Sequence, residues 1–432
     1  MSFYASEARI SKDPIVGLIQ QAGKDNSPEK LVAIIGSAVD DNGNLIVPEA
    51  VNETIKELAA KGFSMEYAPS PGIPMLAELL SEEILGKATC DELKNSGINR
   101  SEIVTVAGTN AITIALLACT SPEDQIITHN PHWAGYDSIT VAINRKPLTN
   151  FDILDASDNF NIAALEQTIK NLLAANAKSK IALVINTPYD NPLGKDFGKE
   201  AWKQIGNVLA KYSENEILII LDTAYVDFGP EGKDYSRLDF LPDLFKRVNN
   251  KNFNLIIAGT VSKSFAMYGA RVGVATLLSA NKENTDNWKD VAGGCVRGTF
   301  SNASRMSQEI ALNILQDKAK LATVHDFQKT ASKLINKRRE VFIAAIKDGL
   351  TEEFRIIRPD SGFFVSMKID NRKFGDSNFA HEFYKKLLAS HLYAPLISDQ
   401  FLRIPPCGLS EAKLEQVAKR IIEVNKSLLA TK

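Results

Sequence analysis

The sequence predicts an α/β protein with a large domain, built on a mainly parallel sheet between helix layers, and a smaller α+β domain. The first observation is a series of continuous apolar runs between residues 103 and 278, which are typical of strands covered by helices on both faces. The second is that these runs alternate with helical patterns. The third is a change after about residue 305, where a long helical pattern precedes short strand-like runs.

The size and charge of the chain limit its organisation and its partners. Its 432 residues, 44% of them hydrophobic, suffice for two domains. We assign residues 46–330 to a large cofactor-binding domain, and residues 1–45 with 331–432 to an N-terminal arm and the small domain. The formal net charge is -2 and no basic block is present, so we expect no nucleic-acid partner. No apolar run approaches the roughly 20 residues of a membrane span, so we expect no membrane partner.

The cysteines and the N-terminus indicate a cytoplasmic protein. The cysteines are Cys90, Cys119, Cys295 and Cys407. None of them pairs at metal-ligand spacing, which is typical of a reduced protein without a bound metal. The N-terminus lacks a charged head followed by an apolar core, so no signal peptide is predicted. His129 and His132 lack a third ligand of suitable type, so we interpret both as structural.

The first 85 residues alternate short elements with loops. Asp13–Leu18 is a small apolar patch that lies either across the body of the protein or across a partner subunit. Leu31–Ile35 has the composition of a short strand. Pro48 opens a helix that runs to about Ala60. An irregular loop rich in Pro and Gly precedes the next helix, Met75–Leu85.

In the predicted large domain, polar clusters follow the ends of the strands. The predicted strands are 103–107, 125–128, 180–185, 216–221, 255–258 and 272–278. The first leads into Gly108-Thr109-Asn110, with a helix from about Ala111, an arrangement that presents backbone N–H groups to a phosphate. Glycine in such a turn is also common for steric reasons alone. Because ligands bind at the carboxyl ends of the strands in open α/β sheets, we expect the polar clusters to form one site.

The C-terminal third predicts the smaller domain. A helical pattern runs from about residue 305 to Leu350. Strand-like runs follow at 362–369 and 401–405, and an amphipathic helix starts at Ser410.

The segment from Thr260 to Gly273 carries the most informative residues. Lys263 follows a buried strand, on a loop, with small hydroxyl residues beside it and Arg271 eight positions on. An amine in this setting can form a Schiff base, while the guanidinium and hydroxyl groups hold a phosphate nearby. A surface loop with two solvated cations would contain the same residues, so the interpretation depends on the other strand ends.

The other strand ends supply groups that fit an aromatic cofactor. Asp222 closes a buried strand, where a carboxylate needs a partner such as a protonated pyridine nitrogen. Tyr225 and Asn191 can bond a phenolic oxygen of the same ring, and Trp133 can stack on its face. Arg403 offers a planar fork for a substrate carboxylate. The candidate phosphate ligands are Gly108, Thr109, Thr260 and Arg271, and Asn110 is a further candidate cofactor-binding residue.

Each of these residues also has a structural explanation. Asp222 could cap a helix, Tyr225 and Trp133 could fill the core, Asn191 could only form a turn, and Arg403 could make a surface ion pair. Their joint occurrence after predicted strands favours the functional interpretation.

The ordered set of motifs resembles the fold type I pyridoxal-phosphate enzymes, in particular the class I aminotransferases of the aspartate and aromatic types. The specific elements are Ser262-Lys263 with Arg271, and Asp222-Thr-Ala-Tyr225. The resemblance extends over nearly the whole chain. Its other pieces are Asp13–Leu18, Gly36 with Asp40–Gly43, Glu66-Tyr67, Gly108-Thr109, Pro131–Trp133, Asn191–Gly194 and Arg403.

The resemblance implies pyridoxal 5'-phosphate as cofactor and a homodimer with shared active sites. Tyr67 would reach the cofactor phosphate of the other subunit, and residues 1–20 would embrace that subunit. Gly36 falls on the substrate-side loop. The segment Arg297–Asn302 is similar to one whose arginine, from the other subunit, binds the distal carboxylate of the substrate.

The chain also departs from the pattern of the aspartate enzymes. Asn186 and Tyr136 stand where those enzymes typically have histidines around the cofactor, and Leu193 replaces a threonine. Ala38 and Val39 differ from the bulkier residues of the substrate-side loop. These changes leave the cofactor chemistry intact and put the amino-acid specificity in question.

We therefore expect transamination between an L-amino acid, acidic (aspartate or glutamate) or aromatic, and 2-oxoglutarate by a ping-pong Schiff-base mechanism. Lys263 would carry the proton, Asp222 would keep the ring nitrogen protonated, and Tyr225 would bond the ring oxygen. The expected substrate-binding residues are Gly36, Asn191, Arg297 and Arg403.

Three alternatives remain open at this point. A β-lyase or a decarboxylase would use the same cofactor with another outcome. A non-enzymatic regulator that binds the cofactor is disfavoured, because the chain has no spare residues or basic helix for a DNA-binding domain. A dinucleotide dehydrogenase would need a G-x-G-x-x-G motif that opens a helix after a strand, which the sequence lacks.

Overall fold

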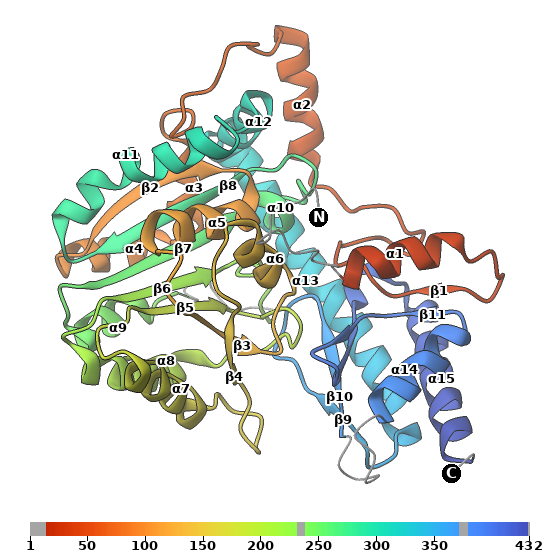
Figure 1. The fold of residues 1–432 in the computed structure, drawn as a ribbon. Coiled ribbons are helices and arrows are strands. Elements are labelled where there is room, and N and C mark those ends of the chain that lie inside the picture. The colour runs from red at the N-terminus through yellow and green to blue at the C-terminus, as the bar shows by residue number, and fades with distance from the viewer. Residues whose placement is uncertain (1–13, 231–237, 371–378, 431–432) are drawn as a thin grey trace, which may run out of the picture.

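The computed structural model describes residues 14–230, 238–370 and 379–430, which form a large body and a smaller one (Figure 1). Residues 1–13, which belong to the predicted N-terminal arm, lie outside the described residues. None of the helices in the described ranges is long and apolar enough to cross a membrane.

The large body is built on a seven-stranded sheet with the order β2-β8-β7-β6-β5-β3-β4. Its strands are β2 (Asn99–Thr105), β3 (Ile126–Asn130), β4 (Thr149–Asp152), β5 (Ile181–Asn186), β6 (Ile217–Asp222), β7 (Phe253–Thr260) and β8 (Gly273–Ser279). Only β8 runs antiparallel to its neighbours, β2 and β7, while the other neighbouring pairs are parallel. The prediction of a mainly parallel sheet is confirmed, and the register places Asn186 beside Asp222 and Asp222 beside Ala258.

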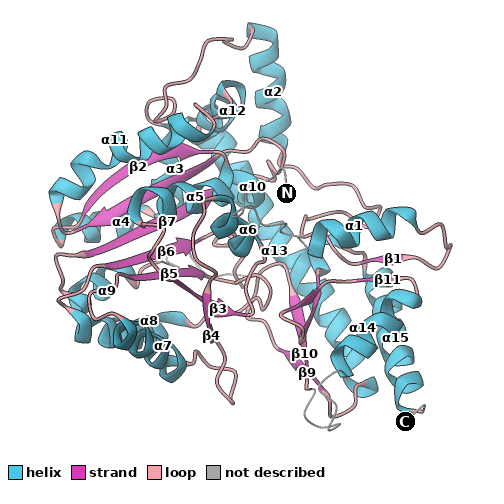
Figure 2. Cartoon of the chain, viewed as in Figure 1, coloured by secondary structure: helices cyan, strands magenta, loops and turns pink. Residues whose placement is uncertain are grey.

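Helices cover both faces of this sheet, as Figure 2 shows. One face packs against α5 (Ala107–Cys119), α6 (Gly135–Ala142) and α11 (Lys282–Thr299). The other packs against α3 (Leu76–Leu85), α7 (Ile162–Ala175), α8 (Gly198–Leu209) and α9 (Leu241–Val248). The remaining helices of this body are α2 (Glu49–Lys61), α4 (Lys87–Asn95), α10 (Val261–Ser264) and α12 (Arg305–Gln316). Side chains that point to both faces are buried, which explains the continuous apolar runs in the sequence.

The smaller body has an antiparallel four-stranded sheet with the order β12-β13-β10-β9. Its strands are β9 (Phe354–Ile357), β10 (Val365–Ile369), β12 (Leu396–Ile397) and β13 (Phe401–Ile404). A separate parallel pair joins β1 (Leu31–Val32) to β11 (Leu392–Tyr393). The helices here are α1 (Pro14–Lys24), α14 (Phe379–Ala389) and α15 (Glu411–Leu429). Segments from both ends of the chain therefore build this body.

The long helix α13 (Lys318–Ile346) runs from the large body to the small one. Val324, near its start, belongs to the core of the large body, whereas Phe342 and Ile346 belong to that of the small body. The predicted boundary at residue 330 falls inside this helix, so the division into domains stays a prediction.

Two local predictions are wrong. The helix after β2 begins at Ala107 rather than at about Ala111. Ala107 takes a φ of 60°, which turns the chain sharply, and the side chain of Asn110 accepts a hydrogen bond from the backbone of Val106 at 3.1 Å. Lys263 lies in the short helix α10 rather than on a loop, because the side chain of Thr260 caps that helix by accepting from the backbone N–H of Ser262.

The predicted strand Leu31–Ile35 is shorter in the structure. Only Leu31 and Val32 pair with a neighbouring strand, and Ile34 turns into a small core with Leu18 of α1. The apolar patch at the start of the chain therefore packs, within the described residues, on the body of its own chain.

Candidate active site

Asp222 ends β6 at the carboxyl edge of the sheet, and its side chain is buried. The hydroxyl of Tyr136 donates to its Oδ2 at 2.9 Å, and the backbone N–H of Ala224 donates to its Oδ1 at 3.2 Å. Burial raises the pKa of Asp222, which the hydrogen bond from Tyr136 and the positive charge of Lys263 oppose. Both donors are neutral, so a cationic N–H group would add a charge-assisted bond to this carboxylate.

Lys263 follows the neighbouring strand β7, and its amine lies 5.4 Å from the centre of the Tyr225 ring. Burial lowers the pKa of Lys263, the negative charge of Asp222 opposes this, and the positive charge of Arg271 adds to it. The amine is thus easier to deprotonate than that of a solvated lysine.

A cationic and hydroxyl-rich corner lies beside Lys263. Thr260 and Ser262 place their hydroxyl oxygens 2.8 Å apart, and Nη1 of Arg271 donates to the hydroxyl of Ser262 at 3.3 Å. Gly108 and Thr109, in the first turn of α5, line the same corner. A helix N-terminus, a guanidinium and two hydroxyl groups form a set that suits a phosphate.

Trp133 lines the cavity on the side of α6. Its ring meets that of Tyr136 edge to face, with centroids 5.6 Å apart. A Cβ atom at Gly135 would come within 2.3 Å of the Trp133 ring, so glycine is required there for this orientation of the indole.

The substrate side of the site is held together by Asn191 and Arg403. Arg403, on β13, is buried and donates to the Asn191 side chain at 2.9 Å and to the carbonyl of Ile34 at 2.8 Å. Its guanidinium lies 4.5 Å from the centre of the Phe364 ring. A Cβ atom at Gly36 would come within 2.6 Å of the same ring, so glycine lets this segment pass close to Phe364.

Asn186 connects these groups although the sequence interpretation gave it no role of its own. Its side chain donates to the carbonyl of Asp222 at 2.7 Å and accepts from the backbone N–H of Asn191 at 2.6 Å. The Asn191 amide in turn lies 3.5 Å from the hydroxyl oxygen of Tyr225.

These groups surround one cavity with a free space of about 490 Å³, its open mouth included. Nine predicted site residues line it: Gly108, Thr109, Trp133, Asn191, Asp222, Tyr225, Thr260, Lys263 and Arg271. Four further lining residues, Ala107, Asn186, Ala224 and Ser262, were not predicted as site residues. Arg403 adjoins the lining through Asn191, whereas the side chain of Asn110 turns back to the backbone of Val106.

Gly36 also lies outside the lining, and two further predicted residues, Tyr67 and Arg297, make none of the site contacts described above. Tyr67 is 88% exposed, and its backbone carbonyl accepts from Arg305 at 3.4 Å. Arg297 is exposed near the end of α11 and donates to the hydroxyl of Ser301 at 2.5 Å. Within one chain, then, neither side chain completes the site, and their roles stay predictions.

The two histidines have structural contacts. Nδ1 of His129 lies 2.7 Å from the carbonyl of Pro131, and burial lowers the pKa of His129 to about 3. Nε2 of His132 lies 2.9 Å from the carboxylate of Asp137. Across the described ranges, no group of three or more His, Cys, Asp or Glu side chains could hold a metal ion.

Comparison with known proteins gives a consistent result. The family model described as "Aminotransferase class I and II" matches residues 35–421. The chain is 24% identical to the mitochondrial aspartate aminotransferase of Dictyostelium discoideum, over 98% of this chain and 94% of that protein. It is 22% identical to the aromatic-amino-acid aminotransferase of Pseudomonas aeruginosa, over 98% and 99% of the two chains.

Solved structures show the same fold. An aminotransferase from Anaerococcus prevotii has a TM-score of 0.83 at 22% identity, with 98% of this chain and 99% of that chain covered. An aromatic-amino-acid aminotransferase from Burkholderia pseudomallei, covalently bound to pyridoxal phosphate, has a TM-score of 0.75 at 20% identity, with 98% and 100% covered. The predicted architecture is therefore confirmed.

Proposed function

The chain belongs to the class I and II aminotransferases, and on that premise we propose that it transfers an amino group from an L-amino acid to 2-oxoglutarate with pyridoxal 5'-phosphate as cofactor. The observation that carries the proposal is the convergence of Asp222, Lys263 and the Arg271 corner on one cavity. The amino donor is acidic or aromatic, the two types found among the related enzymes.

The residues of the cavity fit this cofactor. Asp222 is a buried carboxylate with two neutral donors and room for a cationic N–H partner. Thr260, Ser262 and Arg271, with the start of α5, fit the phosphate. Trp133 supplies a flat aromatic wall.

When bound, the cofactor supplies an electron sink for the carbon that carries the transferred amino group. Lys263 would hold the cofactor through its amine, and the same amine would move the proton at the carbon that carries the transferred amino group. Its burial favours the neutral amine that this task needs. Asp222 would keep a positive charge on the ring nitrogen, and Tyr225 and Asn191, whose polar atoms lie 3.5 Å apart, would bond the ring oxygen.

Arg403 binds the α-carboxylate of the substrate. Its guanidinium is fixed by Asn191, by the carbonyl of Ile34 and by the ring of Phe364, so little side-chain entropy is lost on binding. Gly36 lies against the same Phe364 ring that the guanidinium contacts. A fixed carboxylate orients the bond to be broken relative to the cofactor ring.

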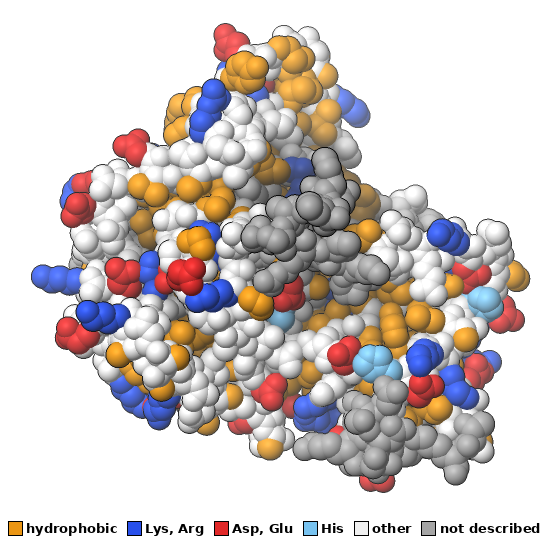
Figure 3. Space-filling view, in the orientation of Figure 1, with side chains coloured by type: hydrophobic (Ala, Val, Ile, Leu, Met, Phe, Trp, Pro, Cys, Tyr) orange, Lys and Arg blue, Asp and Glu red, His pale blue; other side chains and the backbone are white. Residues whose placement is uncertain are grey.

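A homodimer is part of the proposal. Large apolar side chains are exposed on α2, on the loop after it and on α12: Ile55, Met65, Tyr67, Met75 and Met306. In the space-filling view, orange side chains gather at the top of the molecule, over α2 (Figure 3). An apolar surface of this kind indicates a protein partner. With a second copy bound there, Tyr67 would contact the cofactor phosphate in the other subunit. Arg297 would contact the distal carboxylate of the substrate bound in that subunit.

A cytoplasmic location also belongs to the proposal, supported by four free cysteines. The alternatives, a β-lyase, a decarboxylase or a non-enzymatic regulator, are less well supported, because the family match spans residues 35–421 and both curated relatives named above are aminotransferases.

Covalent labelling tests the proposal. The purified protein should be yellow, and borohydride reduction followed by peptide mass spectrometry should place the cofactor mass on Lys263. The matched control is the peptide that contains Lys180, a half-buried lysine at the other end of the strands, which should carry no cofactor mass. Label on a different lysine, or none, contradicts the assignment.

A further inference from the structure

Tyr136 lies directly behind Asp222, outside the lining of the cavity. It occupies the first turn of α6 and is fully buried. Resting on the function proposed above, we infer that Tyr136 is a positioning residue that keeps Asp222 ionised and turned toward the cofactor ring nitrogen.

The ring contacts of Tyr136 orient its hydroxyl group toward Asp222. Its ring stacks on His132, with centroids 5.9 Å apart and planes within 8°, and meets the edge of Trp133. These contacts fix the ring, and the hydroxyl then donates to Oδ2 of Asp222 at 2.9 Å. The Ala224 N–H holds Oδ1, so both carboxylate oxygens have a fixed donor. Rotation of the carboxylate would break one of these bonds.

A tyrosine suits this role because it remains a neutral donor. Burial and the negative charges of Asp222 and Asp190 raise the pKa of Tyr136 well above its usual value, so the phenol stays protonated. The other titratable groups that act on the pair are Tyr225, whose pKa is also raised, and Lys263. A neutral donor stabilises the ionised form of Asp222 relative to its protonated form. Because it carries no positive charge, it does not compete with a pyridinium for the negative charge of Asp222.

The consequence concerns the position of one proton. Without the hydroxyl of Tyr136, Asp222 would bind a proton more tightly, because the hydrogen bond from Tyr136 opposes the rise in its pKa that burial causes. The proton shared with the ring nitrogen would then move toward the carboxyl oxygen. Loss of a hydrogen bond to a charged group should shift this equilibrium about tenfold.

The test uses Tyr136→Phe, loaded with pyridoxal phosphate labelled with ¹⁵N in the ring. Phe keeps the ring contacts and removes only the donor. The matched control is Tyr393→Phe, since Tyr393 donates to Asp25 at the same distance, 2.9 Å, in the small body. The ¹⁵N chemical shift should move toward that of a neutral pyridine in Tyr136→Phe and stay at the wild-type value in Tyr393→Phe. An unchanged shift in Tyr136→Phe, or equal changes in both variants, overturns the inference.

A second variant decides the matter if Tyr136→Phe does not fold. Tyr136→His keeps a ring donor, but one that gains charge as the pH falls. Its ¹⁵N shift should therefore differ from that of the wild type by an amount that varies between about pH 6 and 8. A constant or zero difference contradicts the inference. A wild-type protein that takes up no pyridoxal phosphate would instead refute the proposed function, so the two failures are distinguishable.

Discussion

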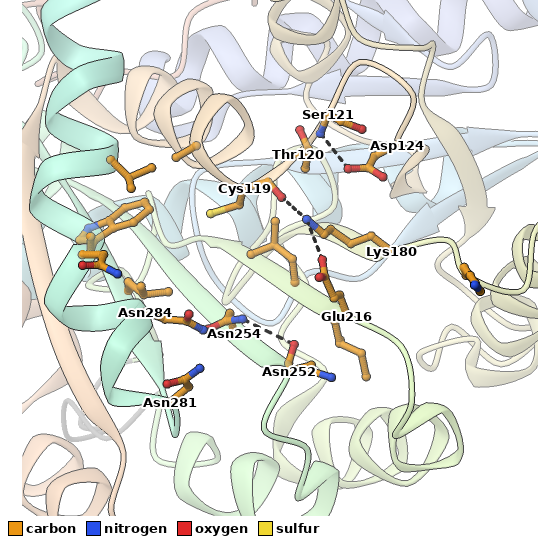
Figure 4. Close-up of a pocket in the computed structure, with 18 residues that line it drawn as sticks. Cys119, Thr120, Ser121, Asp124, Lys180, Glu216, Asn252, Asn254, Asn281 and Asn284 are labelled. Carbon is orange, nitrogen blue, oxygen red and sulfur yellow. Dashed lines mark hydrogen bonds and ion pairs between the residues drawn. The ribbon is translucent and has the colours of Figure 1, made fainter.

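Polar side chains gather at both ends of the strands of the large sheet, here called its amino edge and its carboxyl edge. Charged side chains pair with each other at the amino edge, whereas at the carboxyl edge they are buried and face a cavity. At the amino edge of β5 and β6, Lys180 donates to the carbonyl of Cys119 at 2.6 Å and pairs with Glu216 at 3.1 Å (Figure 4). At the carboxyl edge, Asp222 accepts only from neutral donors among its described hydrogen bonds, and Lys263 lies against the ring of Tyr225. Both edges are hollow, so a pocket alone does not identify the site. Buried ionisable side chains that face a cavity, such as Asp222 and Lys263, are the better indication of a functional site.

Replacing the two lysines should give the largest contrast. Lys263→Ala should lower kcat by roughly a thousandfold or more, because no other described side chain in the cavity can carry the proton. Lys180→Ala should leave kcat within about twofold, since it removes a partly exposed ion pair. Steady-state kinetics with aspartate and 2-oxoglutarate measures both. Similar losses of kcat in the two variants would show that the lysine at the carboxyl edge is no more important for the reaction than the lysine at the amino edge.

The two carboxylates should differ in the same way. Asp222→Ala should leave a bound cofactor and lower kcat by about a hundredfold or more, because loss of one partner of a buried charge pair costs several kcal/mol. Glu216→Ala removes only the exposed partner of Lys180 and should change kcat little. Cofactor content by absorbance, with kcat for each variant, checks the prediction. Wild-type turnover in Asp222→Ala would refute the role of this carboxylate.

Arg297 extends the comparison to a second chain. Arg297→Ala should lower kcat/KM for dicarboxylic substrates about 30-fold, since a charge-assisted contact truncated on one side costs roughly 2–5 kcal/mol. Aromatic substrates should lose much less. The control is Arg247→Ala on α9, which bonds Asp243 and Asn207 of its own chain. Equal losses for tyrosine and aspartate would assign Arg297 to the interface and remove the dicarboxylate preference.

The sequence predicts the carboxyl edge well because its residues are local to strand ends. Asp222 and Lys263 each follow an apolar run, so their placement needs only the rule that such strands end at one edge. The bond from Tyr136 to Asp222 spans 86 positions and depends on how α6 packs, which no pattern in the sequence encodes. Its only signal in the sequence was the resemblance-based expectation that Tyr136 departs from the pattern of the aspartate enzymes.

The misplaced helix start at Ala107 has a similar cause. Alanine rarely takes a positive φ, so nothing in the sequence marks the sharp turn there. The antiparallel strand β8 was also beyond prediction, because apolar runs do not state direction. The roles proposed for Tyr67 and Arg297 would depend on contacts between two chains, which the sequence of one chain does not encode.

The smallest expected effect concerns stability and another buried acid at the carboxyl edge. Asp190 accepts from the backbone N–H of Lys195 at 2.9 Å and of Leu193 at 3.3 Å, and burial raises its pKa to about 7. An unfolded Asp ionises near pH 4, so between about pH 4 and 7 the folded state holds a proton that the unfolded state has lost. The contribution of Asp190 to stability should therefore fall as the pH rises through this window.

Asp190→Asn removes the titration, so its melting temperature relative to the wild type should rise by on the order of a few degrees between pH 5 and 8. The control is Asp124→Asn at the opposite edge, where the carboxylate accepts from the backbone N–H of Ser121 in an exposed turn. Differential scanning calorimetry at several pH values separates the two variants. If both show the same dependence on pH, or if Asp190→Asn shows none, burial at the carboxyl edge does not set the ionisation of Asp190, and the contrast between the edges is limited to Asp222 and Lys263.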